Sequence, residues 1–256
     1  AVGYVDQLVA GKMLGPVALG LYVMAFNMAG WPASLLSQPL RSVAPATFAR
    51  LQESPEEMRQ AMLRITGLVA CVMLPIASVL AVCAVPVVVV LYGEPWASAA
   101  VALAWLAPVA VFRVLHELFY DYLVVLKKSV SILRVQICSL VALVPALILG
   151  AQFAGLSGVA AAPLLVAVAV TSPMYFMALG RAGLRVWDIL GNTQVSLVIA
   201  LAAGAISWVF AEFISPRLLA VGASVVVGLV GIMANLYWRR GDIKSLRLLQ
   251  GEPVQP

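Results

Sequence analysis

The chain has 256 residues, of which 63% are apolar and 11% are charged, and its mean hydropathy is +1.04. Soluble globular proteins are about 45–50% apolar and about 25% charged, so this composition excludes a soluble domain and predicts an integral membrane protein. The net charge of +5 does not indicate nucleic-acid binding, because the basic residues fall in loops between long uncharged runs.

The uncharged runs predict helices. A barrel strand crosses a membrane with about ten residues, whereas a helix needs about 20, and the runs here match the helix. We therefore expect an all-α, polytopic membrane protein with seven complete transmembrane helices. A short apolar piece before them, residues 1–10, is interpreted as the end of a truncated first helix. The predicted helices are 17–42, 65–92, 96–126, 129–151, 156–180, 192–213 and 217–238.

The basic residues alternate between the two ends of the predicted helices. Twelve lysines and arginines lie in every second loop and in the C-terminal tail, whereas the intervening loops carry two, Lys12 and Arg217. Loops rich in lysine and arginine stay on the cytoplasmic side of a membrane. The pattern predicts a multi-pass membrane protein with a cytoplasmic C-terminus.

The first complete helix ends in an arginine. Residues 13–40 carry no charge, and this stretch is long enough to cross a hydrocarbon core of about 30 Å. Arg41 therefore lies near or inside the membrane. Its side chain either reaches back to the cytoplasmic headgroups or faces a cavity, where it would bind an anion. Asp6, in the truncated helix, is a candidate counter-charge.

A second helix begins shortly after this arginine. Ser54 and Glu57 match the Ser-x-x-Glu capping box, and Pro55 suits the first helical position. We interpret this segment as a capped, solvated helix start that runs into the span from residue 65. A catalytic pair formed by Glu56 and Glu57 is the weaker alternative.

The helix predicted at 96–126 carries the densest polarity inside the membrane. Arg113, His116, Glu117, Tyr120 and Asp121 recur at helical spacing and share one face. Such a face is too costly to expose to lipid, so it must contact protein or a water-filled cavity. Two interpretations stay open. Either Arg113 pairs with Glu117 along the helix while a neighbour binds His116, or the face is a cavity wall that contacts substrate or handles protons.

The sequence lacks the motifs of common catalytic and cofactor sites. It contains no P-loop, no dinucleotide-binding glycine motif and no His-Glu-x-x-His zinc motif. Cys71, Cys83 and Cys138 lie within apolar spans and lack the spacing of a metal site. We therefore expect no enzymatic activity, no cofactor and no metal.

Three segments carry a family resemblance, and they follow one another along the chain. They are Asp6–Tyr22 (DQLVAGKMLGPVALGLY), Leu35–Gln52 (LLSQPLRSVAPATFARLQ) and Leu91–Trp96 (LYGEPW). In this order they resemble the C-terminal half of bacterial polysaccharide-biosynthesis flippases. These proteins are the O-antigen and exopolysaccharide transporters of the multidrug/oligosaccharidyl-lipid/polysaccharide exporter superfamily. The resemblance covers about residues 6–126, and the later helices agree in number and hydropathy.

The resemblance implies a transporter of about fourteen helices, built from two lobes and two additional C-terminal helices. Residues 1–180 would then form the C-terminal lobe. Residues 181–238 would form the two additional helices with a preceding interfacial segment, and residues 239–256 a cytoplasmic basic tail. The N-terminal lobe would lie outside this chain.

The resemblance also implies a function, which is the flipping of lipid-linked oligosaccharides across the membrane by alternating access. The partners would be a lipid-linked pyrophosphate oligosaccharide, membrane lipids, the N-terminal lobe and a coupling ion. Arg41 and Arg113 become candidates for binding phosphate. His116, Glu117 and Asp121 become candidates for glycan contacts or ion coupling.

Other functions stay open. Within the superfamily, the alternatives are a flippase of the lipid-linked peptidoglycan precursor and a cation-coupled drug exporter. From a different class, a membrane-embedded glycan polymerase or ligase would act on a similar substrate. Such an enzyme is expected to carry a large extracytoplasmic loop, whereas every predicted outer loop here is short. The loop lengths favour a transporter.

Overall fold

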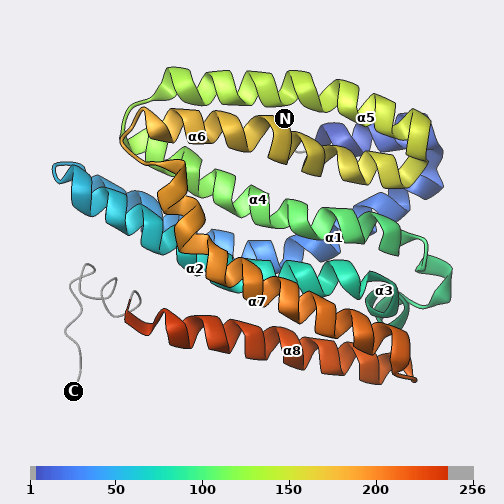
Figure 1. Ribbon diagram of the computed structural model, residues 1–256. Coiled ribbons are helices and arrows are strands. Elements are labelled where there is room, and N and C mark those ends of the chain that lie inside the picture. Colours follow the sequence, from blue (N-terminus) through green and yellow to red (C-terminus); the bar gives the residue numbers. More distant parts are fainter. Residues whose placement is uncertain (1–3, 242–256) are drawn as a thin grey trace.

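The computed structural model describes residues 4–241, which form a bundle of long helices (Figure 1). Every regular element in this range is helical, as the sequence predicts. The elements are α1 (Val5–Arg50), α2 (Pro55–Val82), α3 (Ala84–Tyr92), the short 3₁₀ helix η2 (Glu94–Trp96), α4 (Ala99–Val125), α5 (Ser129–Val166), the π-helix η3 (Ala167–Thr171), α6 (Ser172–Gly180), α7 (Val186–Phe213) and α8 (Arg217–Trp238).

Six helical stretches of the described residues are long and apolar enough to cross a membrane. One of them, Ser129–Gly180, has 52 residues. Its backbone leaves the helical conformation at Gly155, where φ is 55° and ψ is −130°, a combination that favours glycine. Figure 1 shows the chain reversing there, so that two arms lie side by side. The arms correspond to the predicted helices 129–151 and 156–180, and the number of membrane crossings stays a prediction.

Helix α1 also consists of two pieces. Gly15 has φ 87° and ψ 177°, which interrupts the helix, and Figure 1 shows the chain turning back at this end of the bundle. The piece 5–14 corresponds to the short helix that the sequence predicts before the first complete span. The longer piece continues past the predicted end at residue 42 and reaches Arg50.

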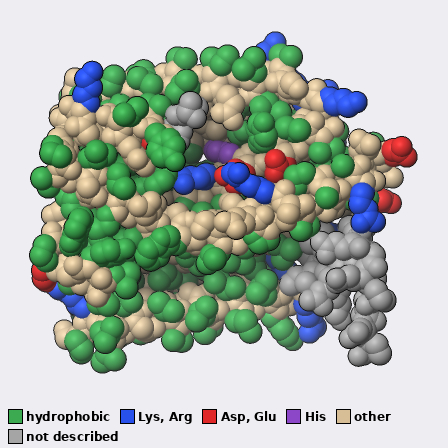
Figure 2. All heavy atoms as spheres, turned by 180° about the vertical axis from the view of Figure 1, so that it is seen from behind, with side chains coloured by type: hydrophobic (Ala, Val, Ile, Leu, Met, Phe, Trp, Pro, Cys, Tyr) green, Lys and Arg blue, Asp and Glu red, His purple; other side chains and the backbone are tan. Residues whose placement is uncertain are grey.

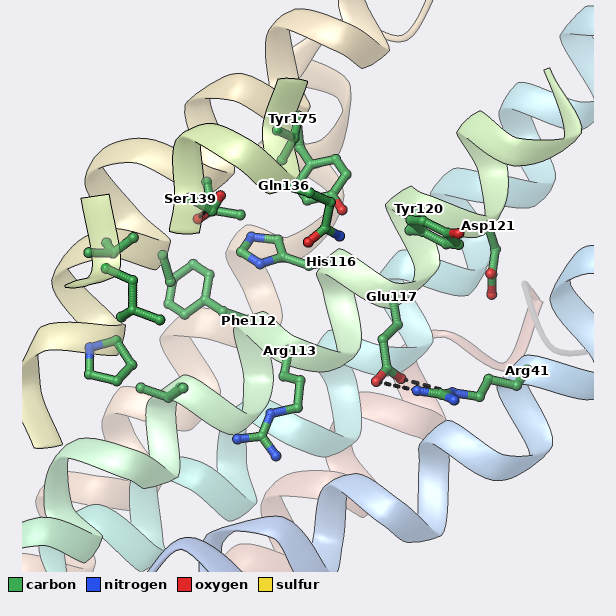
Figure 3. A pocket seen from close by; sticks show the side chains of 17 residues that line it. Arg41, Phe112, Arg113, His116, Glu117, Tyr120, Asp121, Gln136, Ser139 and Tyr175 are labelled. Atoms are coloured by element: carbon green, nitrogen blue, oxygen red, sulfur yellow. Dashed lines mark hydrogen bonds and ion pairs between the residues drawn. The ribbon is translucent and has the colours of Figure 1, made fainter. Parts of the chain in front are cut away.

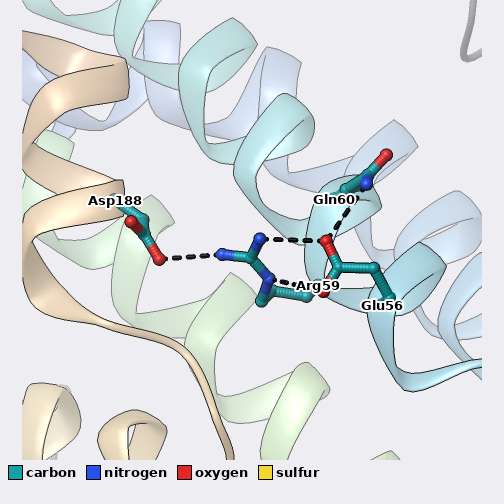
Figure 4. Close-up of polar contacts among 4 residues, drawn as sticks. All are labelled: Glu56, Arg59, Gln60 and Asp188. Atoms are coloured by element: carbon teal, nitrogen blue, oxygen red, sulfur yellow. Dashed lines mark hydrogen bonds and ion pairs between the residues drawn. The ribbon is translucent and has the colours of Figure 1, made fainter.

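The predicted start of α2 is right in position and wrong in detail. The helix begins at Pro55, but the Ser54 side chain makes no capping hydrogen bond. The carboxylate of Glu56 instead accepts hydrogen bonds from Arg59, at 2.9 Å, and from Gln60, at 3.1 Å. Arg59 Nη1 also donates to Asp188 Oδ2 at 2.8 Å (Figure 4). The first turn of α2 is therefore tied to the first turn of α7 by side chains.

Helices α7 and α8 lie together along α2 (Figure 1). Glycines permit the close approach: a Cβ atom on Gly204 would overlap the Ser78 hydroxyl, and one on Gly231 would lie 3.4 Å from the Ile199 side chain. Membrane helices associate through such contacts between small residues, because lipid offers no hydrophobic driving force for helix pairing.

Arg239, the first residue of the predicted cytoplasmic basic tail, is buried in the helix bundle. Arg239 follows α8 directly and is 3% exposed. Its Nη1 donates to Asn192 Oδ1 in α7 at 2.9 Å, and its guanidinium occupies space left open by Gly67 in α2. The arginine is thus buried between helices because α2 and α7 supply a polar partner and a glycine gap. Residues 242–256 of the predicted tail lie outside the described residues.

Helix α4 runs through the middle of the bundle, beside α1, α2 and α5 (Figure 1). Two apolar clusters meet on it. Leu103 and Leu106 belong to one cluster, and Leu118 and Leu123 belong to the other. The remaining face of α4 carries the polar residues that the sequence singles out.

The two arms of the 129–180 hairpin touch backbone to backbone near their turn. A Cβ atom added to Gly158 would overlap the carbonyl group of Gly150, and one added to Gly150 would overlap that of Gly158. Side chains can rotate away from such an overlap, whereas backbone atoms cannot.

Replacing Gly158 by alanine should therefore separate the two arms and destabilise the fold by about 2 kcal/mol or more. The measurement is the thermal unfolding midpoint of the full-length protein in detergent. Gly222→Ala in α8 is the matched control, because a Cβ atom there meets nothing within 4 Å. That control should unfold at or above the wild-type temperature, since alanine favours helix. Equal midpoints for the two variants would contradict the close packing.

Candidate functional site

A cavity of about 520 Å³ lies against the polar face of α4. Helices α1, α5 and α6 and the π-helix η3 supply its other walls (Figure 3). Figure 2 shows it as a hollow in an otherwise largely apolar face, with the chain's single histidine inside and charged side chains at its edge. Its polar lining residues are Arg41, Arg113, His116, Glu117, Tyr120, Asp121, Gln136, Ser139, Thr171 and Tyr175.

An ion pair between α1 and α4 lies at the edge of the cavity. Arg41 Nη2 lies 2.7 Å from Glu117 Oε1, and Arg41 Nε lies 3.4 Å from Oε2 (Figure 3). The Arg41 side chain is 65% exposed and that of Glu117 is 25% exposed. Asp121, one turn further along α4, also interacts electrostatically with Arg41. The pair between Arg113 and Glu117, one of the two interpretations that the sequence leaves open, is not among the described ion pairs, because α1 brings Arg41 to the Glu117 carboxylate.

Arg113 lies deeper in the same wall. It is half-buried, and its guanidinium carbon lies 4.5 Å from the ring centroid of Phe26 in α1. A cation over an aromatic face is attracted by the ring quadrupole, and the attraction strengthens away from water. Phe26 therefore supports the Arg113 guanidinium, and Arg113 also lines the cavity.

Asp6 lies apart from the cavity, and the prediction that it pairs with Arg41 is wrong. Its side chain accepts hydrogen bonds from the Tyr22 hydroxyl, at 2.7 Å, and from the Gln7 backbone, at 2.9 Å. Asp6 and Tyr22 are both buried. The turn at Gly15 places Asp6 beside Tyr22, and Arg41 follows Tyr22 by about 28 Å of helix. Asp6 therefore joins the two pieces of α1.

His116 of α4 lines the cavity and contacts two residues of α6. Its Nε2 lies 3.0 Å from Ser172 Oγ, and its ring stacks on Tyr175 with centroids 5.1 Å apart. The π-helix η3 precedes Ser172 directly. On that π-helix, Thr171 hydrogen-bonds Ser139 of α5 at 2.9 Å. Neighbouring hydroxyls thus bind two different helices, and π-helical turns are often found at functional sites.

Four polar lining residues were not singled out from the sequence: Gln136, Ser139, Thr171 and Tyr175. They lie in helices 129–151 and 156–180, which are mainly apolar. Isolated polar residues in such helices give no periodic signal. The three-residue spacing of Gln136 and Ser139 is the one local hint that both lie on the same face.

A second cavity, of about 290 Å³, lies behind this wall between α2, α4, α6 and α7. Its lining is mainly aliphatic and aromatic. Phe112 and His116 line both cavities, so a single layer of side chains separates the polar space from the apolar one.

The polar cavity has the chemistry of a binding site. Its guanidinium groups suit phosphate, and its hydroxyls, amide and aromatic rings suit a hydroxyl-rich ligand. Among residues 4–241, no group of three or more histidine, cysteine, aspartate or glutamate side chains is arranged to hold a metal ion. The arrangement can therefore bind and orient an anionic, polar molecule beside an apolar space.

Comparison with known proteins supports the family resemblance. A family model described as "Polysaccharide biosynthesis protein" matches residues 1–101. The lipopolysaccharide biosynthesis protein WzxC of Escherichia coli (strain K12) is 26% identical over 196 residues, which cover 77% of this chain and 38% of WzxC. These matches show that the chain is similar to polysaccharide-biosynthesis proteins over its N-terminal part.

The chain is also similar to the teichuronic acid biosynthesis protein TuaB of Bacillus subtilis (strain 168). The two are 28% identical over 111 residues, which cover 43% of this chain and 23% of TuaB. The chain therefore spans well under half the length of these two relatives. Its fold is similar to that of part of the lipid II flippase MurJ, solved in an inward closed conformation. The TM-score is 0.76 at 12% identity, and the match covers 94% of this chain and 52% of that one.

The Asp6–Tyr22 contact can be tested by its contribution to stability. Tyr22→Phe removes the donor from a buried carboxylate and should destabilise the protein by about 1–3 kcal/mol. A second change, Asp6→Leu, should restore part of that loss, because the unpaired carboxylate is then gone. Thermal unfolding of the single and double variants measures both effects.

The control is Tyr4→Phe, because Tyr4 is 66% exposed and its hydroxyl should contribute little. A double variant that unfolds at a lower temperature than Tyr22→Phe would contradict the structural role assigned to Asp6.

Proposed function

We propose that the full-length protein translocates lipid-linked oligosaccharide or polysaccharide precursors across the bacterial cytoplasmic membrane. The observation that carries this proposal is a polar cavity with two arginines inside an apolar bundle that is similar to polysaccharide-biosynthesis proteins. A lipid-linked glycan presents an anionic pyrophosphate and a polar sugar chain, and both need such a space to pass through hydrocarbon. The protein acts in this proposal as a transporter and not as an enzyme.

The cavity offers one set of side chains for phosphate and another for sugar. Arg41 and Arg113 present guanidinium groups, which bind phosphate oxygens through paired N–H donors. Gln136, Ser139 and Tyr175 offer an amide, a hydroxyl and an aromatic face for sugar hydroxyls and rings. The lipid tail stays in the bilayer, where its transfer requires no polar partner.

Alternating access is the proposed mechanism. All residues that line the polar cavity fall between positions 41 and 175, which supports residues 1–180 as one lobe and residues 181–238 as two appended helices. The second lobe comes from the part of the full-length protein outside this chain and closes the cavity from the other side. Rocking of the two lobes then exposes the site to each face of the membrane in turn.

A cytoplasmic C-terminus and an inner-membrane location belong to the same proposal. They are supported by the basic loops on one side of the predicted spans. His116, Glu117 and Asp121 are the titratable side chains of the cavity that could couple transport to an ion.

A second candidate substrate is a lipid-linked peptidoglycan precursor. The observation that favours it is the fold similarity to the lipid II flippase MurJ. Both candidates carry a pyrophosphate and a polar glycan, so the arginine chemistry is common to them.

Arg113→Ala tests the proposal. Loss of the half-buried cation should reduce translocation by about tenfold or more, since a phosphate contact in a partly dry site is worth about 1.5–3 kcal/mol. The measurement is the amount of lipid-linked glycan that reaches the outer leaflet in cells whose own gene is deleted and replaced by the variant. Protein amounts in the membrane are compared by immunoblot.

Arg217→Ala is the matched control. Arg217 is exposed, pairs with Glu94 and lies outside the cavity, so its loss should leave translocation at the wild-type rate. Wild-type translocation by Arg113→Ala, at wild-type protein amounts, would refute the assignment of the cavity as the site.

A further inference from the structure

The contact between Arg41 and Glu117 resembles the contact expected between Arg41 and its ligand. Both Nη2 and Nε of the guanidinium point to one carboxylate, at 2.7 and 3.4 Å (Figure 3). Arginine binds phosphate through the same fork of donors. Glu117 therefore occupies the side of Arg41 that a phosphate group would use.

This ion pair can be opened easily. The Arg41 side chain is 65% exposed in this chain, so an anion in the cavity can reach it without unpacking the helices. In a water-filled cavity such an ion pair contributes little to stability, because water competes for both partners. The pair joins α1 to α4 at the edge of the cavity and is not part of the apolar core. An anion that enters the cavity thus meets an arginine whose present partner is weakly held.

The displaced carboxylate would keep a cation nearby. Arg113 precedes Glu117 by one turn of α4, and side chains at this spacing are neighbours on a helix surface. Arg113 is held over Phe26 in the present structure and lines the same cavity. Glu117 can therefore leave Arg41 without losing all compensation of its charge.

We propose that Glu117 is an internal competitor for the anionic group of the substrate. It holds Arg41 while the cavity is empty, and a diphosphate displaces it on binding. The inference rests on the proposed function and adds an affinity threshold that every anion has to overcome. Because only the fraction of Arg41 that is free can bind, every anion loses affinity by the same factor. A lipid diphosphate overcomes this loss, whereas the singly charged phosphodiesters of bulk phospholipid fall below useful affinity.

Binding measurements on the full-length protein in detergent test this proposal. The probes are a fluorescent polyprenyl diphosphate, phosphatidylglycerol and inorganic pyrophosphate. Glu117→Gln should bind each of them about three- to tenfold more tightly than the wild type, by the same factor for each. Polyprenyl diphosphate should bind more tightly than inorganic pyrophosphate. The reverse order would overturn the lipid-linked source of the anion.

Asp121→Asn is the matched control for charge. Asp121 also interacts electrostatically with Arg41, but no hydrogen bond joins the two side chains among the described contacts. Its loss should tighten binding by less than about twofold. Equal gains for Glu117→Gln and Asp121→Asn would mean that net charge alone matters, and this would overturn the proposal.

Arg41→Ala distinguishes the competitor role of Glu117 from the proposed function of the cavity. It should weaken binding of the diphosphate, and Glu117→Gln should then change affinity by less than about twofold in the Arg41→Ala background. Weaker binding by Glu117→Gln alone would make Glu117 a ligand contact and overturn the competitor role while leaving the proposed function intact. Wild-type binding by both Arg41→Ala and Arg113→Ala would overturn the proposed function together with this inference.

Discussion

The charged face of α4 is the constraint on which the rest of the structure depends. An arginine, a histidine and two carboxylates on one helix face cannot contact lipid, because each would lose water without gaining a partner. The bundle meets this constraint with side chains from other helices. Helix α1 supplies Arg41 and α6 supplies Ser172, and a polar cavity remains between them.

The opposite side of α4 serves packing. There, α2 is joined to α7 and α8 by glycine contacts, by Arg59 and Asp188 at one end, and by Arg239 and Asn192. None of the residues that line the polar cavity comes from α7 or α8. The described part of the chain therefore separates a closely packed side from an open, polar side. Such a division suits a protein in which one surface must rearrange while another holds its shape.

The sequence predicts the helices and the polar face of α4 well, because hydropathy and helical period are local properties. It predicts partners poorly. Glu117 has a cation four residues earlier, yet tertiary packing brings Arg41 to it instead. Asp6 pairs with Tyr22 because the chain turns at Gly15, and no spacing rule reports the direction of that turn. The π-helix before Ser172 has no sequence signature that we recognise.

In the proposed function, the polar face of α4 contacts the anionic part of a lipid-linked substrate. Photocrosslinking can detect this contact in the full-length protein. A photoreactive amino acid replaces Tyr120, which lines the cavity, or Val101, which is exposed on α4 outside it. If the polar face binds the substrate, a polyprenyl diphosphate should crosslink at position 120, and unlabelled diphosphate should prevent the reaction. Little crosslinking is expected at position 101. Equal crosslinking at both positions, unaffected by unlabelled diphosphate, would contradict the proposed contact.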